Sequence, residues 1–214
     1  EPIDFTKSGD NKLTLVNNTN DWNGNTTVSG GTLQLDEDLN TPNGKTTVTA
    51  GSTLELNTGN LTTSGIEGTD IEEEDTPKID LTGSDASAGD VTIDGPSDNT
   101  NTFEGKITGD GSITKKGDST QKLTGENDFD GVVDVNEGTL VMNFVNGADN
   151  EVNAQDDTEF GFKTPADAGN ITFAGELKGN NQNPDEDITL SQRGPGDITL
   201  TGKLSGFTAL RIAS

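Results

Sequence analysis

Three carboxylates stand close together in the stretch ENDFDGVVD, namely Asp128, Asp130 and Asp134. Two carboxyl groups that flank a sugar can act as acid and base, or as acid and nucleophile, in glycoside cleavage. Asp128 and Asp130 share one face if the segment is extended, because side chains alternate along a strand. The two arginines that a lyase could use, Arg193 and Arg211, are distant in sequence. We therefore interpret the cluster as solvated turn residues and keep a polysaccharide lyase or hydrolase as the alternative function.

Nucleophilic catalysis of the usual kinds is excluded by composition. The 214 residues include no His and no Cys, so neither a Ser-His-Asp nor a Cys-His arrangement can form within the chain. The Gly-x-Ser-x-Gly motif is absent as well. These absences favour a protein that is not an enzyme.

Acidic runs offer hard oxygen ligands of the kind that calcium prefers. The candidate ligands are Asp36, Asp38, Glu73, Asp75, Asp185 and Asp187. None of the runs has EF-hand spacing, and no Gly-Gly-x-Gly-x-Asp array occurs. The sequence therefore predicts weak Ca²⁺ binding at most and no other cofactor.

A formal net charge of -25 limits the possible partners. Such a charge repels nucleic-acid phosphates and anionic bilayers at ordinary salt concentrations. No apolar run approaches the ~18 residues that a transmembrane helix needs. We expect neither nucleic-acid binding nor direct membrane insertion of this segment.

Short runs in which apolar and polar residues alternate indicate the elements that carry these side chains. Period-two alternation is typical of strands with one buried face, and no window shows a 3.6-residue apolar period. The clearest runs are 13–15, 33–35, 54–56, 91–93, 133–135, 188–190 and 198–200. The sequence predicts an all-β protein with essentially no helix.

Two stretches, Phe5 to Leu35 and Ile113 to Met142, read as copies of one unit. A shorter echo relates 26–33 to 46–54 by a shift of 20 to 21 positions, since Thr26 matches Thr46 and Thr32 matches Thr53. A period of this size suits one coil of a parallel β-solenoid better than a sandwich, whose turns recur every ~8–12 residues. We predict about ten rungs, taking roughly 20–23 residues per rung.

The whole chain, 1–214, reads as a single solenoid segment. Irregular loops are expected near 66–77, around an acidic run, and near 179–187. The alternating end, 208–212, predicts that the solenoid continues beyond this segment, because solenoid ends need a cap or further repeats. Trp22 aligns with Phe129 between the two copies, so both are expected to be core residues rather than ligand-stacking platforms.

The unit at 109–142 resembles the passenger-associated repeat of bacterial autotransporters. The pattern runs Gly-x-Gly, an aliphatic residue, Thr-Lys-x-Gly, a short strand, Gly-x-Asn and an aromatic residue, and it ends on a Gly-x-Leu turn. The matching positions are Gly109, Gly111, Ile113, Thr114, Lys115, Gly117, Leu123, Gly125, Asn127, Phe129, Gly131, Val135, Gly138, Thr139 and Leu140. The first copy matches at Thr6, Lys7, Gly9, Trp22, Gly24, Thr26, Val28, Gly31, Thr32 and Leu33, but it lacks the Gly-x-Asn.

The resemblance implies a right-handed parallel β-helix displayed at the surface of a Gram-negative bacterium, with a translocating barrel C-terminal to this segment. It implies an adhesin, or a self-association module in aggregation, biofilm formation or virulence. The partners would then be a host cell-surface or matrix ligand, or the same protein on another cell. A structural stalk without a ligand is the third interpretation.

Overall fold

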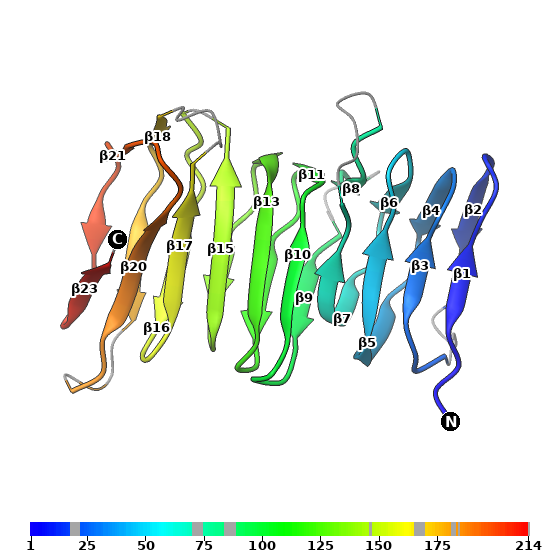
Figure 1. Cartoon of the computed structure of the whole chain (residues 1–214), viewed down its shortest axis with the longest axis horizontal. Helices are drawn as coiled ribbons and strands as arrows, with labels where there is room; N and C mark the ends of the chain where they lie inside the picture. The colour runs from blue at the N-terminus through cyan, green and yellow to red at the C-terminus, as the bar shows by residue number, and fades with distance from the viewer. Residues whose placement is uncertain are drawn as a thin grey trace.

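Short parallel strands, stacked coil upon coil, make up the chain in the computed structural model (Figure 1). The structure describes residues 1–17, 22–69, 75–83, 89–145, 147–164, 170–180, 183 and 185–213. All strand pairs within these residues are parallel, and none of these residues is helical. The coil completes about nine turns, which agrees with the prediction of about ten rungs. The two termini lie at opposite ends of the stack (Figure 1).

Two long sheets and one short sheet run along the stack. The strands of the 10-stranded sheet are β1 (Phe5–Lys7), β3 (Thr26–Val28), β5 (Leu39–Val48), β7 (Leu61–Glu67), β9 (Val91–Asp94), β12 (Ile113–Lys116), β14 (Val133–Val135), β16 (Val152–Gln155), β19 (Leu177–Asn180) and β22 (Leu204–Ser205). The strands of the 11-stranded sheet are β2 (Lys12–Leu15), β4 (Thr32–Leu35), β6 (Thr53–Leu56), β8 (Lys78–Leu81), β10 (Thr100–Phe103), β11 (Lys106–Gly109), β13 (Thr120–Phe129), β15 (Thr139–Phe144), β17 (Glu159–Lys163), β20 (Ile188–Arg193) and β23 (Leu210–Ala213). The short sheet pairs β18 (Ile171–Phe173) with β21 (Ile198–Leu200).

A coil has more than two sides, because long strands bend around its corners. Strand β13 pairs with β10 where Thr100 faces Thr120, and with β11 where Thr108 faces Asp128. Its register with β15 shifts between these two parts. The first part of β13 therefore continues a side of the solenoid that β15, β17, β20 and β23 extend toward the C-terminus.

The pairing register confirms the repeats read from the sequence. Thr26 pairs with Thr46, and Thr32 pairs with Thr53, as the short echo predicts. Hydrogen bonds between equivalent positions of neighbouring coils join residues 20 to 22 positions apart. Equivalent positions of successive coils therefore stack on one another, in places with identical residues such as Leu33 and Leu54.

The inward side chains form one hydrophobic column. In the N-terminal half the column is aliphatic, with Leu33 stacked on Leu54 and both fully buried. Toward the C-terminus it becomes aromatic around Phe144, whose ring centroid lies 5.1 Å from that of Phe173. Burying each such side chain contributes about 1.5–3 kcal/mol, so a narrow column can hold the stack together. Phe129 belongs to this core as predicted, whereas Trp22 is partly buried at its margin.

One turn of the repeat requires glycine. Gly31 and Gly138 occupy the same repeat position, with φ of 60° and 69°. A Cβ atom at Gly31 would lie 2.6 Å from the carbonyl oxygen of Asp10 in the preceding coil. The close approach of successive turns and the left-handed backbone explain why the repeat carries Gly before its Thr-Leu strand.

Both irregular segments begin later in the chain than the sequence predicted. Strand β7 extends through Glu67, where the predicted loop 66–77 had already begun, because Ile66 is buried and paired along the sheet. Strand β19 likewise includes residues 179 and 180 of the predicted loop 179–187. Residues 70–74, 181, 182 and 184 lie outside the described part of the chain.

Candidate binding surfaces

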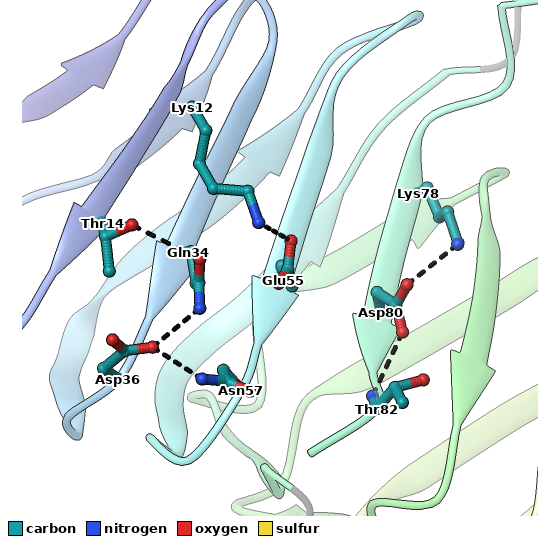
Figure 2. A network of polar contacts seen from close by, with 9 residues as sticks. All are labelled: Lys12, Thr14, Gln34, Asp36, Glu55, Asn57, Lys78, Asp80 and Thr82. Atoms are coloured by element: carbon teal, nitrogen blue, oxygen red, sulfur yellow. Dashed lines mark hydrogen bonds and ion pairs between the residues drawn. The ribbon is translucent and has the colours of Figure 1, made fainter. Parts of the chain in front are cut away.

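Outward side chains on and just after β2, β4, β6 and β8 form three neighbouring groups of polar contacts, which together we call the polar stripe (Figure 2). Its members are Lys12, Thr14, Gln34, Asp36, Glu55, Asn57, Lys78, Asp80 and Thr82. Lys12 reaches across one coil to Glu55, with Nζ 2.7 Å from Oε2. Lys78 lies 2.9 Å from Asp80. Lys12, Glu55, Lys78 and Asp80 thus form two ion pairs within the stripe.

Amide and hydroxyl groups link the coils of the polar stripe. The Asp36 carboxylate accepts hydrogen bonds from Gln34 at 2.8 Å and from Asn57 at 2.9 Å. The Thr14 hydroxyl donates to the Gln34 amide oxygen at 3.3 Å. Burial alone would raise the pKa of Asp80, but hydrogen bonds from Thr82 and the Lys78 ammonium together hold it below its usual value.

A hollow of about 410 Å³ lies over β10, β13, β15, β17 and β20, and we call it the basic groove. It is lined by Thr100, Thr120, Lys122, Thr124, Thr139, Val141, Glu159, Lys163 and Arg193. A second hollow of about 490 Å³ adjoins it at Thr100 and extends toward Thr47 and Glu67. Together they form a long depression along one side of the solenoid.

Strand register builds the basic groove from parallel rows of side chains. One row stacks Thr100, Thr120 and Thr139 and continues with Glu159. The adjacent row stacks Lys122, Val141 and Gly161, followed by Ser191. Gly161 and Ser191 are small, so the second row does not fill the depression. Even a Cβ atom at Gly161 would lie 2.8 Å from the Ser191 hydroxyl.

Charges in the basic groove are unevenly paired. Arg193 lies 2.5 Å from the Glu159 carboxylate, which also accepts a hydrogen bond from Ser191 at 2.5 Å. Lys163 donates to the backbone carbonyl of Thr164 at 2.9 Å. No carboxylate within the described residues lies at ion-pair distance from Lys122 or Lys163. Burial alone would raise the pKa of Glu159, but the bonds from Ser191 and Arg193 together lower it.

Two buried lysines, Lys7 and Lys115, occupy the same position of the two long repeats, and their role was not predicted from the sequence. The Lys7 ammonium donates to the carbonyl oxygens of Gly9 and Gly30, each at 2.7 Å. Lys115 donates to Gly117 at 2.5 Å and to Glu137 at 3.3 Å. Each lysine therefore bridges its own turn and the matching turn of the next coil. The alternating pattern could have shown this, since it places Lys115 on the inward face with Ile113.

Burial sets the protonation behaviour of Lys115. It lowers the pKa of the ammonium to about 8, although the carboxylates of Asp94, Glu137 and Asp118 oppose the shift. The carbonyl acceptors match a charged ammonium, which has three donors and no acceptor. This arrangement is structural and offers no site to a ligand.

The predicted calcium ligands are dispersed along the chain. Asp36 belongs to the polar stripe, and Asp38 accepts hydrogen bonds from the backbone and side chain of Asn60 at 2.9 and 3.0 Å. Asp75 follows the segment 70–74, and Glu73 lies outside the described residues. Asp187 borders a small hollow beside Glu159, and the Asp185 backbone amide donates to Asn183 at 3.1 Å. The described residues contain no group of three or more acidic side chains placed to hold a metal, and calcium binding stays a prediction.

The carboxylates considered for sugar cleavage have different partners. Asp128, at the end of β13, lies 4.0 Å from the Lys106 ammonium. Asp134, in β14, accepts a hydrogen bond from Asn153 at 2.8 Å. Asp130 is exposed just beyond β13. Arg193 lies in the basic groove with Glu159, and Arg211 lies in β23, so neither contacts these aspartates.

Comparison with known proteins agrees with this architecture. The passenger-associated-transport-repeat family matches residues 5–35 and 113–142. The chain is 32% identical over 209 residues to the "Adhesin BmaC autotransporter" of Brucella suis biovar 1 (strain 1330). That alignment covers 92% of this chain and 5% of the relative. No solved structure matches the chain significantly.

The parallel solenoid and its two matched repeats define an autotransporter passenger. Two segments of the chain match the passenger-associated-transport-repeat family, and with the similarity to an autotransporter adhesin they support an autotransporter passenger with such repeats. Its place is the cell surface of a Gram-negative bacterium, exposed to the exterior. The described residues include no helix capable of spanning a membrane.

Proposed function

We propose that this segment is an adhesive module that self-associates between cells through the polar stripe. The supporting observation is the mixture of charges there: Lys12 and Lys78 lie in one row and Glu55 and Asp80 in the adjacent row, on a chain whose net charge is -25. An isologous contact needs a self-complementary patch, and a patch that carries both signs meets this requirement. The surrounding acidic surface would repel a second copy.

Strength in such a contact comes from repetition. A single exposed hydrogen bond contributes only about 0.5–1.5 kcal/mol, so one coil alone would bind weakly. The polar stripe repeats its donors and acceptors over β2, β4, β6 and β8, and many copies are displayed on each cell, so avidity adds to the weak contacts. The absence of His and Cys supports binding rather than turnover.

The test displays the segment on a non-aggregating bacterium and follows settling and attachment to host cells, with and without calcium. Reversing charge in Lys12→Glu/Lys78→Glu should slow settling strongly. The matched control is Lys178→Glu/Lys203→Glu, which reverses two lysines that are also ion-paired but lie on β19 and just before β22. Surface abundance is checked with an antibody for every variant.

A complementary mixture sharpens this test. Cells that display Lys12→Glu/Lys78→Glu should settle with cells that display Glu55→Lys/Asp80→Lys, because the reversed charges again face opposite charges. Settling that is equal in wild type and the stripe variant would overturn the proposal. A segment that is displayed correctly but neither settles nor attaches would support the stalk interpretation instead.

A further inference from the structure

The basic groove brings together, on one face of an acidic chain, two lysines that have no ion-pair partner among the described residues. Lys12, Lys45 and Lys78 each lie within 3 Å of a carboxylate, at 2.7, 2.8 and 2.9 Å. Lys122 and Lys163 have no such partner among the residues that the structure describes. Glu159 is the one carboxylate among the described residues lining the groove, and Arg193 already neutralises it. The local charge is therefore positive.

The shape of the basic groove suits an extended polymer. Five strands, β10, β13, β15, β17 and β20, cross its floor, and neighbouring strands lie ~4.8 Å apart. The threonine row at Thr100, Thr120 and Thr139 thus presents one hydroxyl per coil. This spacing is similar to the advance of one sugar along an extended polysaccharide. The adjoining hollow at Thr100 lengthens the path along the solenoid axis.

The chemistry of the lining distinguishes between classes of polymer. Peptides commonly bind by adding a strand to an open sheet edge, whereas the basic groove lies on a sheet face whose backbone groups are already paired. Single-stranded nucleic acids need aromatic side chains for base stacking, and the groove is lined by none among the described residues. Threonine hydroxyls and ammonium groups match the hydroxyl and acidic groups of a charged sugar.

We propose that the basic groove binds an extended acidic polysaccharide. Its carboxylate or sulfate groups contact Lys122 and Lys163, and its hydroxyls bond to the row formed by Thr100, Thr120 and Thr139. The ligand lies along the solenoid axis, across the coils. This surface is separate from the polar stripe, so the inference does not depend on self-association.

The net charge of -25 does not oppose this inference at short range. Screening at physiological salt reduces interactions between exposed charges beyond about 8 Å. Contacts within the groove are therefore set mainly by Lys122, Lys163 and the neutralised pair of Arg193 and Glu159. The distant acidic surface slows the approach of the polymer more than it weakens the bound state.

The experiment measures binding of the purified chain by calorimetry, at low and at physiological salt. The probes are polygalacturonate, dextran sulfate, neutral dextran and a single-stranded oligothymidylate. We expect binding to polygalacturonate, to dextran sulfate or to both, and the two arms separate carboxylate from sulfate recognition. Lys122→Gln/Lys163→Gln should lower the affinity about tenfold or more, since two charge-assisted contacts are lost.

Two further variants act as controls. Lys106→Gln/Lys178→Gln removes the same charge outside both the groove and the polar stripe and should change affinity less than about twofold. Lys122→Arg/Lys163→Arg keeps the charge and should bind within about threefold of wild type. Unchanged melting temperatures confirm that each variant is folded.

Several results would overturn the inference. These are equal binding of neutral dextran, equal or tighter binding of the oligothymidylate, or equal loss of affinity in the Lys106/Lys178 control. Shortening of the polymer during incubation would also contradict it, because the groove would then turn its ligand over. Settling of displayed cells is scored separately, so failure of self-association and failure of polysaccharide binding are distinguishable.

Discussion

The polar stripe and the basic groove are built in the same way, but they differ in how their charges are paired. Both consist of outward side chains held in rows by the register of parallel strands. In the stripe, Lys12 and Lys78 each find a carboxylate within 2.9 Å, on another coil or on the same strand. In the groove, Lys122 and Lys163 lack one among the described residues. The stripe therefore carries charges of both signs that are paired within one copy, whereas the groove carries ammonium groups without an ion-pair partner among the described residues.

This difference shows which residues of a repeat protein can change from coil to coil while the fold stays the same. Outward positions contribute little to the core, so the identity of each row is free to change from coil to coil. Glu55 in the stripe and Lys122 in the groove both occupy outward positions of paired strands. In the stripe, a row with Lys12 and Lys78 lies beside a row with Glu55 and Asp80, so the charges pair within the chain. In the groove, Lys122 lies beside a row of threonines and remains open to a ligand of the opposite sign.

The largest expected effect tests whether the basic groove and the polar stripe are stabilised by different buried interactions. Gln121 is fully buried beneath the groove, and its amide exchanges two hydrogen bonds of 2.9 Å with the backbone of Ile66. Gln121→Leu leaves both backbone groups unpaired and should lower the free energy of unfolding by about 2–4 kcal/mol. Chemical unfolding measures the loss. Hydrogen exchange should rise in β7, β10 and β13 and stay unchanged in β2 and β4.

The matched control for this change is Gln34→Leu in the stripe, whose amide is partly exposed and should cost less than about 1 kcal/mol. Equal losses of unfolding free energy in the two variants, or faster hydrogen exchange in all strands, would show that the same interactions stabilise both surfaces.

A moderate effect is expected from the one carboxylate of the groove lining. Glu159→Gln removes the negative charge from the acceptor of Ser191 and Arg193 and should cost about 1 kcal/mol. Because the folded-state pKa of Glu159 is lowered, its contribution is present above the unfolded value, near 4.5, and is lost as the pH falls through the folded pKa. The stabilities of wild type and variant should therefore converge in acid. Urea unfolding at several pH values measures this.

Glu159→Gln also tests whether the positive charge of the basic groove determines binding. Freeing Arg193 should tighten binding of an acidic polysaccharide by about threefold to tenfold, since one more cation becomes available. Weaker binding would mean that Glu159 contacts the ligand directly and that the comparison between groove and stripe assigns this residue the wrong role.

The smallest effect is expected from the ion pairs of the stripe. Lys12→Gln and Lys78→Gln should each change the free energy of unfolding by less than about 0.5 kcal/mol, because their partners are partly exposed and screened by salt. Thermal unfolding at low and high salt measures both. A loss above about 1 kcal/mol would show that these pairs stabilise the stack and are not spare surface for a second copy.

Much of the fold could be predicted, since register follows from a repeat that is visible in the sequence. The match of Thr26 with Thr46 and of Thr32 with Thr53 is confirmed as strand pairing. The basic groove could not be predicted in the same way. Glu159 pairs with Thr189 across an intervening segment far longer than the ordinary step. The number of residues inserted between coils is not encoded in any pattern, so Lys163 and Arg193 gave no sign of being neighbours.

The lysines of the two long repeats couple each coil to the one that follows it. Lys7 donates to the backbone carbonyl of Gly30, and Lys115 donates to the backbone carbonyl of Glu137. Both carbonyls belong to the coil that follows the lysine in the sequence. A coil that ends before that carbonyl leaves a buried ammonium short of an acceptor, which is costly in a poorly solvated site. Addition of the next coil removes this cost. The stack is therefore more cooperative at these two junctions, and a shortened segment that retains Lys115 must extend past Glu137 to be complete.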